Sequence, residues 1–237
     1  MNSLDALGRR NPEWAPWLGV LRRALDAAGD PAWNAMVPDV KSHGGHGRPM
    51  LDGATVRLDR ALLEPYCSSL RGALDGDCAA VPAMAIFRTA LGGDEPGLDE
   101  LGRAARARPD ALRAVAGLLT LPFLQACSRA WSEAARVADP VGWCPVCGGW
   151  PAFAEVCGVD RARCARCVRC GAAWPAQPLR CAYCGESDHA ALGTLQAESA
   201  TAPAGIDVCH RCRGYVKVLN TIRPGAPAQV PLDDLAS

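Results

Sequence analysis

The sequence lacks an excess of either charge, and it lacks a hydrophobic run long enough to cross a membrane. Its 25 lysine and arginine residues balance 25 aspartate and glutamate residues, so the formal net charge at pH 7 is zero. Without a long-range positive field, binding to nucleic acid or anionic lipid is disfavoured. The most apolar stretch, 111–127, is interrupted by Arg113, Pro122 and Gln125 and is shorter than the roughly 20 apolar residues that span a bilayer. We therefore expect no nucleic-acid partner and no membrane insertion.

A secretory signal is also missing, because residues 1–5 carry neither a cationic segment nor an apolar one. We therefore expect a cytoplasmic protein. Its 13 cysteines cannot all pair in disulfides, since their number is odd. In a reducing compartment, clustered cysteines indicate metal binding or redox chemistry.

The first part of the chain, residues 1–138, is expected to form a bundle of helices. In the first helix Asn11 is expected to be the cap and Pro12 the first helical residue, and Pro122 predicts a kink in the longest one. Apolar residues recur at helical spacing near 11–28, 59–75, 78–91, 97–107 and 110–137.

A second domain is predicted for residues 139–223, which hold ten of the 13 cysteines and only short strand-like runs, such as 150–156 and 206–208. Large apolar residues are too few there for an independent core, so metal binding is expected to order this domain. Residues 224–237 are expected to form an extended or loosely docked tail. The predicted fold class is α plus small metal-binding β, a helical N-terminal bundle followed by two ribbon-like metal modules in series.

Four Cys-x-x-Cys pairs are the strongest signal in the sequence. Two intervening residues fold the backbone into a tight turn, called a knuckle here, which directs both sulfurs at one metal ion. A following glycine permits the left-handed conformation that completes the turn; Gly148, Gly171 and Gly185 occupy that place, and Gly214 comes one residue late. The four knuckles are Cys144–Cys147, Cys167–Cys170, Cys181–Cys184 and Cys209–Cys212.

Pairing the knuckles in chain order gives two sites of four cysteines. Nineteen residues (148–166) separate the first two knuckles, 24 (185–208) separate the last two, and only ten (171–180) connect the sites. Two ribbons packed side by side are therefore expected, although a cross-braced pairing of first with third and second with fourth is an alternative. The predicted ligands are Cys144, Cys147, Cys167 and Cys170 for the first site, and Cys181, Cys184, Cys209 and Cys212 for the second.

Cys164 introduces an ambiguity, because it also forms a Cys-x-x-Cys pair with Cys167 and suggests the start of an iron–sulfur motif. The fourth ligand of that motif and its proline are missing, so Cys164 is assigned as a spare. Cys157 has no assigned partner. Sites closed by four thiolates are usually structural, since a catalytic metal keeps a position open for water or substrate.

Five arginines lie between residues 161 and 180, with no carboxylate after Asp160. Two readings stay open for this basic segment. It either neutralises the excess negative charge of two tetrathiolate centres or forms a docking surface for an acidic partner. The candidate partner contacts are Arg161, Arg163, Arg166 and Arg169.

These motifs resemble the FdhE-type formate dehydrogenase accessory proteins, and the resemblance spans most of the chain. The order of four knuckles with the Gly-Tyr-x-Lys ending is the specific part; the match near 48–51 and 58–59 is weaker. The matching segments are Cys144–Gly148 preceded by 123–126, Cys167–Gly171 with Trp174, Arg180–Glu186, and Cys209–Lys217.

The resemblance implies a helical domain joined to two rubredoxin-like metal modules. It also implies a cytoplasmic accessory factor that binds the catalytic subunit of formate dehydrogenase during maturation. Rubredoxin-like knuckles favour iron slightly, whereas zinc is the default for four cysteines. The extra Cys157 and Cys164 and the arginine-rich second knuckle depart from the family pattern.

No catalytic residue is predicted, because no nucleotide-binding fingerprint, phosphate loop or nucleophile with its base is recognisable. A non-enzymatic assembly factor is the favoured function. A rubredoxin-like electron carrier is the main alternative, since four-thiolate iron can cycle between ferric and ferrous states. A zinc-ribbon binding module and a dithiol oxidoreductase are less favoured. The sequence predicts no oligomeric state.

Overall fold

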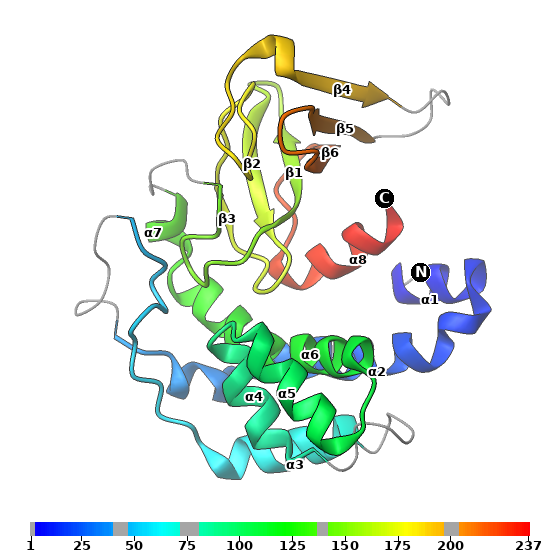
Figure 1. The fold of residues 1–237 in the computed structure, drawn as a ribbon, viewed down its shortest axis with the longest axis vertical. Helices are drawn as coiled ribbons and strands as arrows, with labels where there is room; N and C mark the ends of the chain where they lie inside the picture. The colour runs from blue at the N-terminus through cyan, green and yellow to red at the C-terminus, as the bar shows by residue number, and fades with distance from the viewer. Residues whose placement is uncertain (1–2, 40–46, 72–80, 137–141, 197–203) are drawn as a thin grey trace. The chain divides into compact units, whose positions relative to one another are not determined.

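The computed structural model describes residues 3–39, 47–71, 81–136, 142–196 and 204–237 (Figure 1). It divides into two compact units. The first comprises Met1–Pro38 and Thr55–Ala126, and the second comprises Asp39–Ala54 and Cys127–Ser237. The predicted fold class is confirmed, since helices make up the first unit and a small sheet carrying two cysteine clusters dominates the second.

The first unit is held together by helices whose apolar faces form its core. Trp33 and Tyr66 pack edge to face with ring centroids 5.2 Å apart, and the Tyr66 hydroxyl donates to the Leu118 carbonyl at 2.6 Å. Phe87 and Phe123 form a second edge-to-face pair. The helices are α1 (Ser3–Arg10), α2 (Ala15–Ala28), α3 (Arg60–Arg71), α4 (Ala83–Leu91), α5 (Glu95–Ala105) and α6 (Pro109–Ala130), with 3-10 turns at Pro12–Trp14 and Pro31–Met36.

Two details of the predicted helices are wrong. The side chain of Asn11 does not cap the helix that follows; its amide donates backwards to the Leu7 carbonyl at 3.4 Å, because α1, which was not predicted, ends just before it. The longest helix stops at Ala130, and a separate short helix, α7 (Ser132–Arg136), follows it.

Helix α6 contains Pro122 and is the one described helix that is long and apolar enough to cross a membrane by length and composition. The stretch that passes this test is Asp110–Ala130, and 78% of its most apolar window is buried inside the protein. Such burial is typical of the core helix of a globular unit.

The second unit is built on one six-stranded sheet in the order β3-β2-β1-β6-β5-β4 (Figure 1). Each half of the sheet belongs to one cysteine module, and both modules repeat the order knuckle, two strands, knuckle, strand. The halves join where β1 and β6 pair in parallel, so the two ribbons lie side by side as one continuous sheet. The strands are β1 (Pro151–Cys157), β2 (Ala162–Cys167), β3 (Ala173–Pro175), β4 (Leu192–Gln196), β5 (Ala204–Cys209) and β6 (Tyr215–Thr221).

The tail expected to be extended contains a helix instead. A 3-10 turn at Pro227–Gln229 leads into α8 (Val230–Ala236), which contacts β1. Val230 is buried with Phe153 and Leu219 in a small core, and the Lys217 ammonium donates to both the carboxylate and the carbonyl of Asp234. The buried apolar contacts and the two Lys217–Asp234 hydrogen bonds hold α8 against the sheet.

The second unit also includes a segment from much earlier in the chain, around Met50 and Leu51. The amides of Met50 and Leu51 donate to the carbonyls of Pro145 and Val146 at 2.8 and 3.0 Å. This segment is thereby bonded to the first knuckle. The second compact unit therefore includes residues 39–54. Its main part begins at Cys127, whereas the sequence predicted a domain boundary at residue 138.

Candidate metal centres

The structure brings the eight knuckle cysteines together in two groups of four, paired in chain order as predicted. In the first group, site 1, the Sγ atoms of Cys144 and Cys170 lie 3.6 Å apart and those of Cys147 and Cys167 lie 3.5 Å apart. The serial arrangement is therefore confirmed, and the cross-braced alternative is wrong.

The second group, site 2, repeats this geometry. The Sγ atoms of Cys181 and Cys212 lie 3.6 Å apart, and those of Cys184 and Cys209 lie 3.7 Å apart. A tetrahedral ion with metal–sulfur bonds of about 2.3 Å needs sulfur separations of about 3.8 Å. The four separations of 3.5–3.7 Å lie close to that value, and all four sulfurs of each cluster lie within 4.8 Å of one another.

The backbone of each knuckle explains why the sulfurs converge. Gly148, Gly171 and Gly185 have φ angles of 72°, 70° and 75°, the left-handed conformation that the sequence assigned to them. In the fourth knuckle Arg213 takes this place at φ 61°, because the glycine comes one residue later. Left-handed conformations are costly for residues with a Cβ, so this knuckle bears strain that the other three avoid.

Backbone amides donate to the sulfurs, as an anionic tetrathiolate centre requires. Arg169 N lies 3.3 Å from Cys167 Sγ, Tyr183 N 3.4 Å from Cys181 Sγ, and Gly214 N 3.4 Å from Cys212 Sγ. These bonds stabilise thiolates rather than thiols.

Each cluster contains a thiol that deprotonates easily. In site 1, hydrogen bonds from the neighbouring thiols, with Cys144 the strongest, hold the pKa of Cys147 well below its usual range, while burial raises the pKa of Cys144 and Cys170. In site 2, the amide of Cys212 is the main cause that lowers the pKa of Cys209 to about 7. A divalent cation would supply the positive charge needed to ionise the remaining thiols.

The two clusters differ in exposure. In site 1 the side chains of Cys144, Cys167 and Cys170 are buried and that of Cys147 is partly buried. In site 2, by contrast, Cys184 and Cys212 are exposed. Site 2 is therefore more accessible to solvent than site 1.

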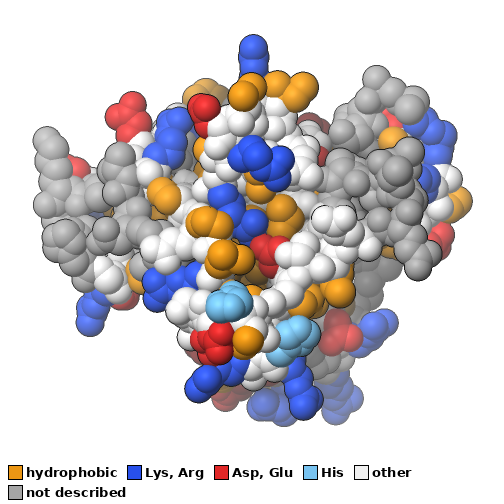
Figure 2. Space-filling model, turned by 90° about the horizontal axis from the view of Figure 1, so that it is seen from above, with side chains coloured by type: hydrophobic (Ala, Val, Ile, Leu, Met, Phe, Trp, Pro, Cys, Tyr) orange, Lys and Arg blue, Asp and Glu red, His pale blue; other side chains and the backbone are white. Residues whose placement is uncertain are grey.

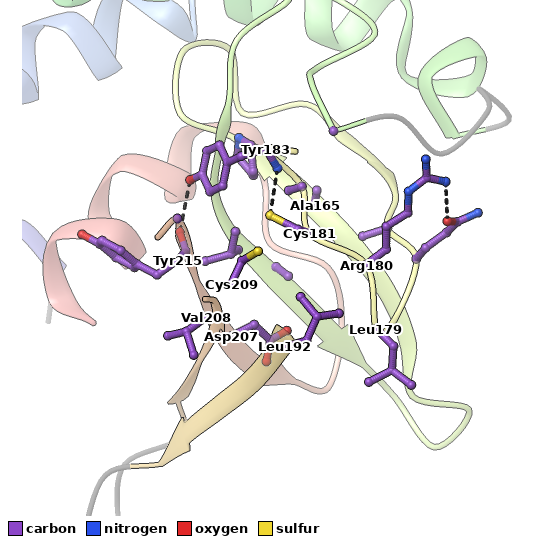
Figure 3. A pocket seen from close by; sticks show the side chains of 18 of the residues that line it. Ala165, Leu179, Arg180, Cys181, Tyr183, Leu192, Asp207, Val208, Cys209 and Tyr215 are labelled. Carbon is purple, nitrogen blue, oxygen red and sulfur yellow. Dashed lines mark hydrogen bonds between the residues drawn. The ribbon is translucent and has the colours of Figure 1, made fainter. Parts of the chain in front are cut away.

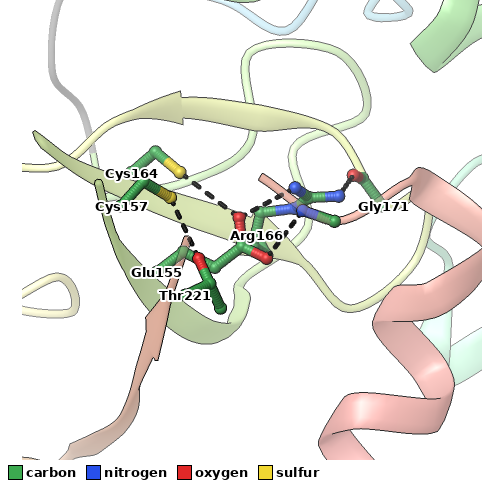
Figure 4. A network of polar contacts seen from close by, with 7 residues as sticks. Glu155, Cys157, Cys164, Arg166, Gly171 and Thr221 are labelled. Carbon is green, nitrogen blue, oxygen red and sulfur yellow. Dashed lines mark hydrogen bonds and ion pairs between the residues drawn. The ribbon is translucent and has the colours of Figure 1, made fainter. Parts of the chain in front are cut away.

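Cys164 lies outside both clusters, as the sequence assigned it. It groups with Cys157 and Glu155 on strands β1 and β2, where its Sγ lies 3.7 Å from a Glu155 carboxylate oxygen (Figure 4). Burial, and then the Glu155 charge, raise the pKa of Cys164 to about 12. Because Arg166 already neutralises Glu155, this group is a poor cation site despite its metal-binding residue types.

The predicted arginine surface is largely absent. Arg166 is buried and paired with Glu155, and Arg163 pairs with Asp207 at 2.5 Å from a half-buried position. Arg169 donates to the Cys147 carbonyl at 3.5 Å, next to site 1. Of the four candidate contacts only Arg161 is fully exposed. The sequence could not distinguish them, because it does not show which strand face is covered.

No protein-family model and no curated protein matches the sequence. Among solved structures, the chain is similar to the crystal structure of the FdhE protein from Pseudomonas aeruginosa, with a TM-score of 0.57 and 21% sequence identity. The similarity covers 99% of this chain and 86% of that one. The resemblance found in the knuckle motifs is confirmed at the level of the fold: from its N-terminal helices to both cysteine modules, this chain has the fold of an FdhE protein.

Proposed function

We propose that the protein is a non-enzymatic accessory factor that binds the catalytic subunit of formate dehydrogenase during its maturation in the cytoplasm. The observation that carries this proposal is the FdhE fold over 99% of the chain, with both four-cysteine clusters in place. The knuckle motifs that resemble those of FdhE-type proteins support it independently, because they depend on the sequence and not on the fold comparison. The absence of a recognisable catalytic motif in the sequence agrees with an accessory role.

The proposed ligands of two metal ions are the eight knuckle cysteines. The sulfur separations of 3.5–3.7 Å and the amide donors to the sulfurs support this assignment. Iron is slightly favoured over zinc because the knuckles are rubredoxin-like. Bound iron would supply a one-electron couple, whereas zinc would only stabilise the fold. Elemental analysis and an absorption spectrum of protein purified without added metal test both points: two ions are expected, with a red colour for ferric iron.

Deletion of the gene tests the function. Formate dehydrogenase activity should fall in the deletion strain and return with the wild-type gene, and the catalytic subunit should co-purify with the tagged protein. A Cys164→Ser variant is the matched control, because this thiol belongs to neither cluster, and it should restore activity fully. A deletion strain with full activity would refute the accessory role.

Electron transfer is a second candidate function, favoured by the exposure of Cys184 and Cys212 at site 2. An exposed thiolate gives a bound iron ion a short path to a redox partner. Fast, reversible reduction by a physiological donor, with electrons passed on to an acceptor, would favour this function over the accessory role.

A further inference from the structure

A pocket of about 470 Å³ lies in the second unit, against one face of the sheet and the 176–185 segment (Figure 3). Its volume falls in the range of ligand sites, about 300–1,000 Å³. The first module contributes Trp150 and Arg163, and the second contributes Tyr183, Asp207 and Tyr215. Both modules are therefore needed to form the pocket.

Exposed apolar side chains gather around this pocket. Of eight large hydrophobic side chains that are exposed in the described part of the chain, four line it: Trp150, Leu179, Tyr183 and Tyr215. The rings of Trp150 and Tyr183 lie 5.2 Å apart, and the Tyr183 hydroxyl donates to the Tyr215 carbonyl. These two contacts join the three aromatic residues into one wall of the pocket. Clustered, exposed aromatic surface is typical of binding sites.

Leu179 occupies an unusual position at the rim of the pocket. Its φ angle is 56°, the left-handed conformation that disfavours leucine, and its side chain is 73% exposed. Little apolar burial offsets this strain. A partner that covers Leu179 would provide that burial.

The charges at the pocket leave one cation available. Arg163 is neutralised by Asp207 on the sheet. Arg180 is exposed beside Leu179 and donates to the neutral Gln177 amide oxygen at 3.0 Å (Figure 3). None of the ion pairs formed by the described residues includes Arg180. Figure 2, seen from above relative to Figure 1, shows basic and apolar side chains next to one another on the described part of that face.

The pocket also adjoins an edge of the sheet. Leu192, Gly193 and Thr194 line it and belong to β4, the last strand in the sheet order. Within the described ranges, no strand pairs with the outer side of β4. An open strand edge of this kind can accept an extended peptide through backbone hydrogen bonds.

We propose that this pocket binds an extended peptide segment of a partner protein in which an aromatic or aliphatic side chain stands next to a carboxylate. The apolar side chain packs on Trp150 and Tyr183, the carboxylate pairs with Arg180, and the peptide backbone lies along β4. Single-stranded nucleic acid also stacks on aromatic rings, but a pocket with one available cation suits a phosphate backbone poorly. The inference rests on the proposed function only for the identity of the partner.

A nuclear magnetic resonance titration of the metal-loaded, ¹⁵N-labelled full chain tests the pocket directly. The probe is a capped nine-residue peptide with Phe-Glu at the centre of a glycine-serine background. It should shift the amide signals of Thr194 and Tyr215 and the indole signal of Trp150, with a Kd about five-fold below those of matched Phe-Lys and Ser-Glu peptides. Equal affinity for the three peptides, or no shifts at the pocket, would overturn the proposal. So would tighter binding of a thymidine decamer at the same signals.

Matched variants separate the pocket from general surface effects. Arg180→Glu should weaken binding of the Phe-Glu peptide about ten-fold, while Arg223→Glu, a charge reversal at another exposed arginine outside the pocket, should not. Leu179→Asn, whose new side chain tolerates the left-handed backbone, should weaken binding, whereas Ile222→Asn should not. Equal effects within either pair would contradict the proposed site.

The same variants distinguish this inference from the proposed function. If the catalytic subunit of formate dehydrogenase binds wild-type protein and is lost with Arg180→Glu, both stand. If the catalytic subunit binds the wild type and both charge-reversal variants equally, the accessory function stands. The proposal that the pocket binds this subunit then fails. If the Phe-Glu peptide binds but the catalytic subunit does not, the pocket stands and the proposed partner fails.

Discussion

Arg166 and Glu155 form an ion pair across β1 and β2 at 3.0 Å, with both side chains at least 98% buried (Figure 4). Arg166 also donates to the Gly171 carbonyl in the second knuckle, and Glu155 accepts from the Gly225 amide ahead of α8. The pair therefore links site 1 to the C-terminal segment. Because Arg166 directly precedes the candidate ligand Cys167, the ion pair also helps to hold site 1 in place.

Removing the charge of Glu155 should destabilise the protein strongly. Glu155→Gln leaves the Arg166 guanidinium buried without a counter-charge, and such a loss costs about 3–5 kcal/mol. Urea unfolding of the metal-loaded protein measures the change in the free energy of unfolding. Glu64→Gln is the control, since the Arg60–Glu64 pair is exposed and should contribute less than about 1 kcal/mol. Similar effects of the two substitutions would contradict the supporting role of the buried pair.

Each cluster should lose its own ion when one of its cysteines is replaced. Cys147→Ser should reduce the metal content from two ions to one by emptying site 1, and Cys184→Ser should do the same at site 2, because three thiolates and a hydroxyl bind weakly. Elemental analysis gives the count. Cys164→Ser should keep both ions. Retention of two ions by either cluster variant would refute the ligand assignment.

The ion in site 2 should leave before the ion in site 1. Two of its four cysteines are exposed, so a chelator reaches the ion without local unfolding, whereas site 1 must open first. Mixing metal-loaded protein with a colorimetric chelator should give two phases of one ion each. The fast phase should be missing in Cys184→Ser. A single phase that releases both ions together would argue against this difference.

Alkylation should spare Cys164 in the folded protein. Burial and the Glu155 charge raise its pKa to about 12, and only the thiolate reacts, so at pH 8 iodoacetamide should leave it unmodified. Because its folded pKa lies above the ordinary thiol value of 9.0, this group stabilises the fold below pH 9 and loses that contribution as the pH rises toward 12. Mass spectrometry after alkylation in native buffer and in urea gives the comparison. Equal labelling at pH 8 in both would contradict the raised pKa.

The cysteine clusters were predictable because a knuckle is a local structure. Two residues between cysteines and a glycine after them determine the turn, and the ten-residue connection 171–180 favours pairing in series. The C-terminal helix was missed because its position depends on remote contacts. Glu155 and the Gly225 amide are 70 residues apart, and no local pattern predicts their hydrogen bond.

The roles of the arginines were missed for a related reason. Arg163 and Arg166 are close in sequence, but the first pairs with Asp207 and the second with Glu155 on the other side of the sheet. Glu155 comes from β1, the neighbour of β2 in the sheet, whereas Asp207 comes from β5, which does not pair with β2. Charge clustering along the chain therefore suggested a surface where the fold makes internal ion pairs.

Two knuckle glycines in equivalent positions should differ in their tolerance of alanine. Gly171 and Gly185 both adopt the left-handed conformation, so either substitution bears a backbone cost of about 1–2 kcal/mol. A Cβ on Gly171 would also lie 2.5 Å from the Pro227 carbonyl oxygen, while the nearest atom to one on Gly185 is the Arg180 guanidinium at 3.6 Å. Gly171→Ala should therefore displace the 3-10 turn and loosen α8 from the sheet.

Urea unfolding and limited proteolysis of the metal-loaded variants test this difference. Gly171→Ala should be the less stable of the two and should be cleaved near residues 224–229, because the displaced segment loses the Gly225–Glu155 and Lys217–Asp234 contacts. Gly185→Ala should show only the backbone cost, with its C-terminus protected as in the wild type. If both variants unfold at the same urea concentration and resist cleavage equally, the C-terminal segment does not brace the second knuckle.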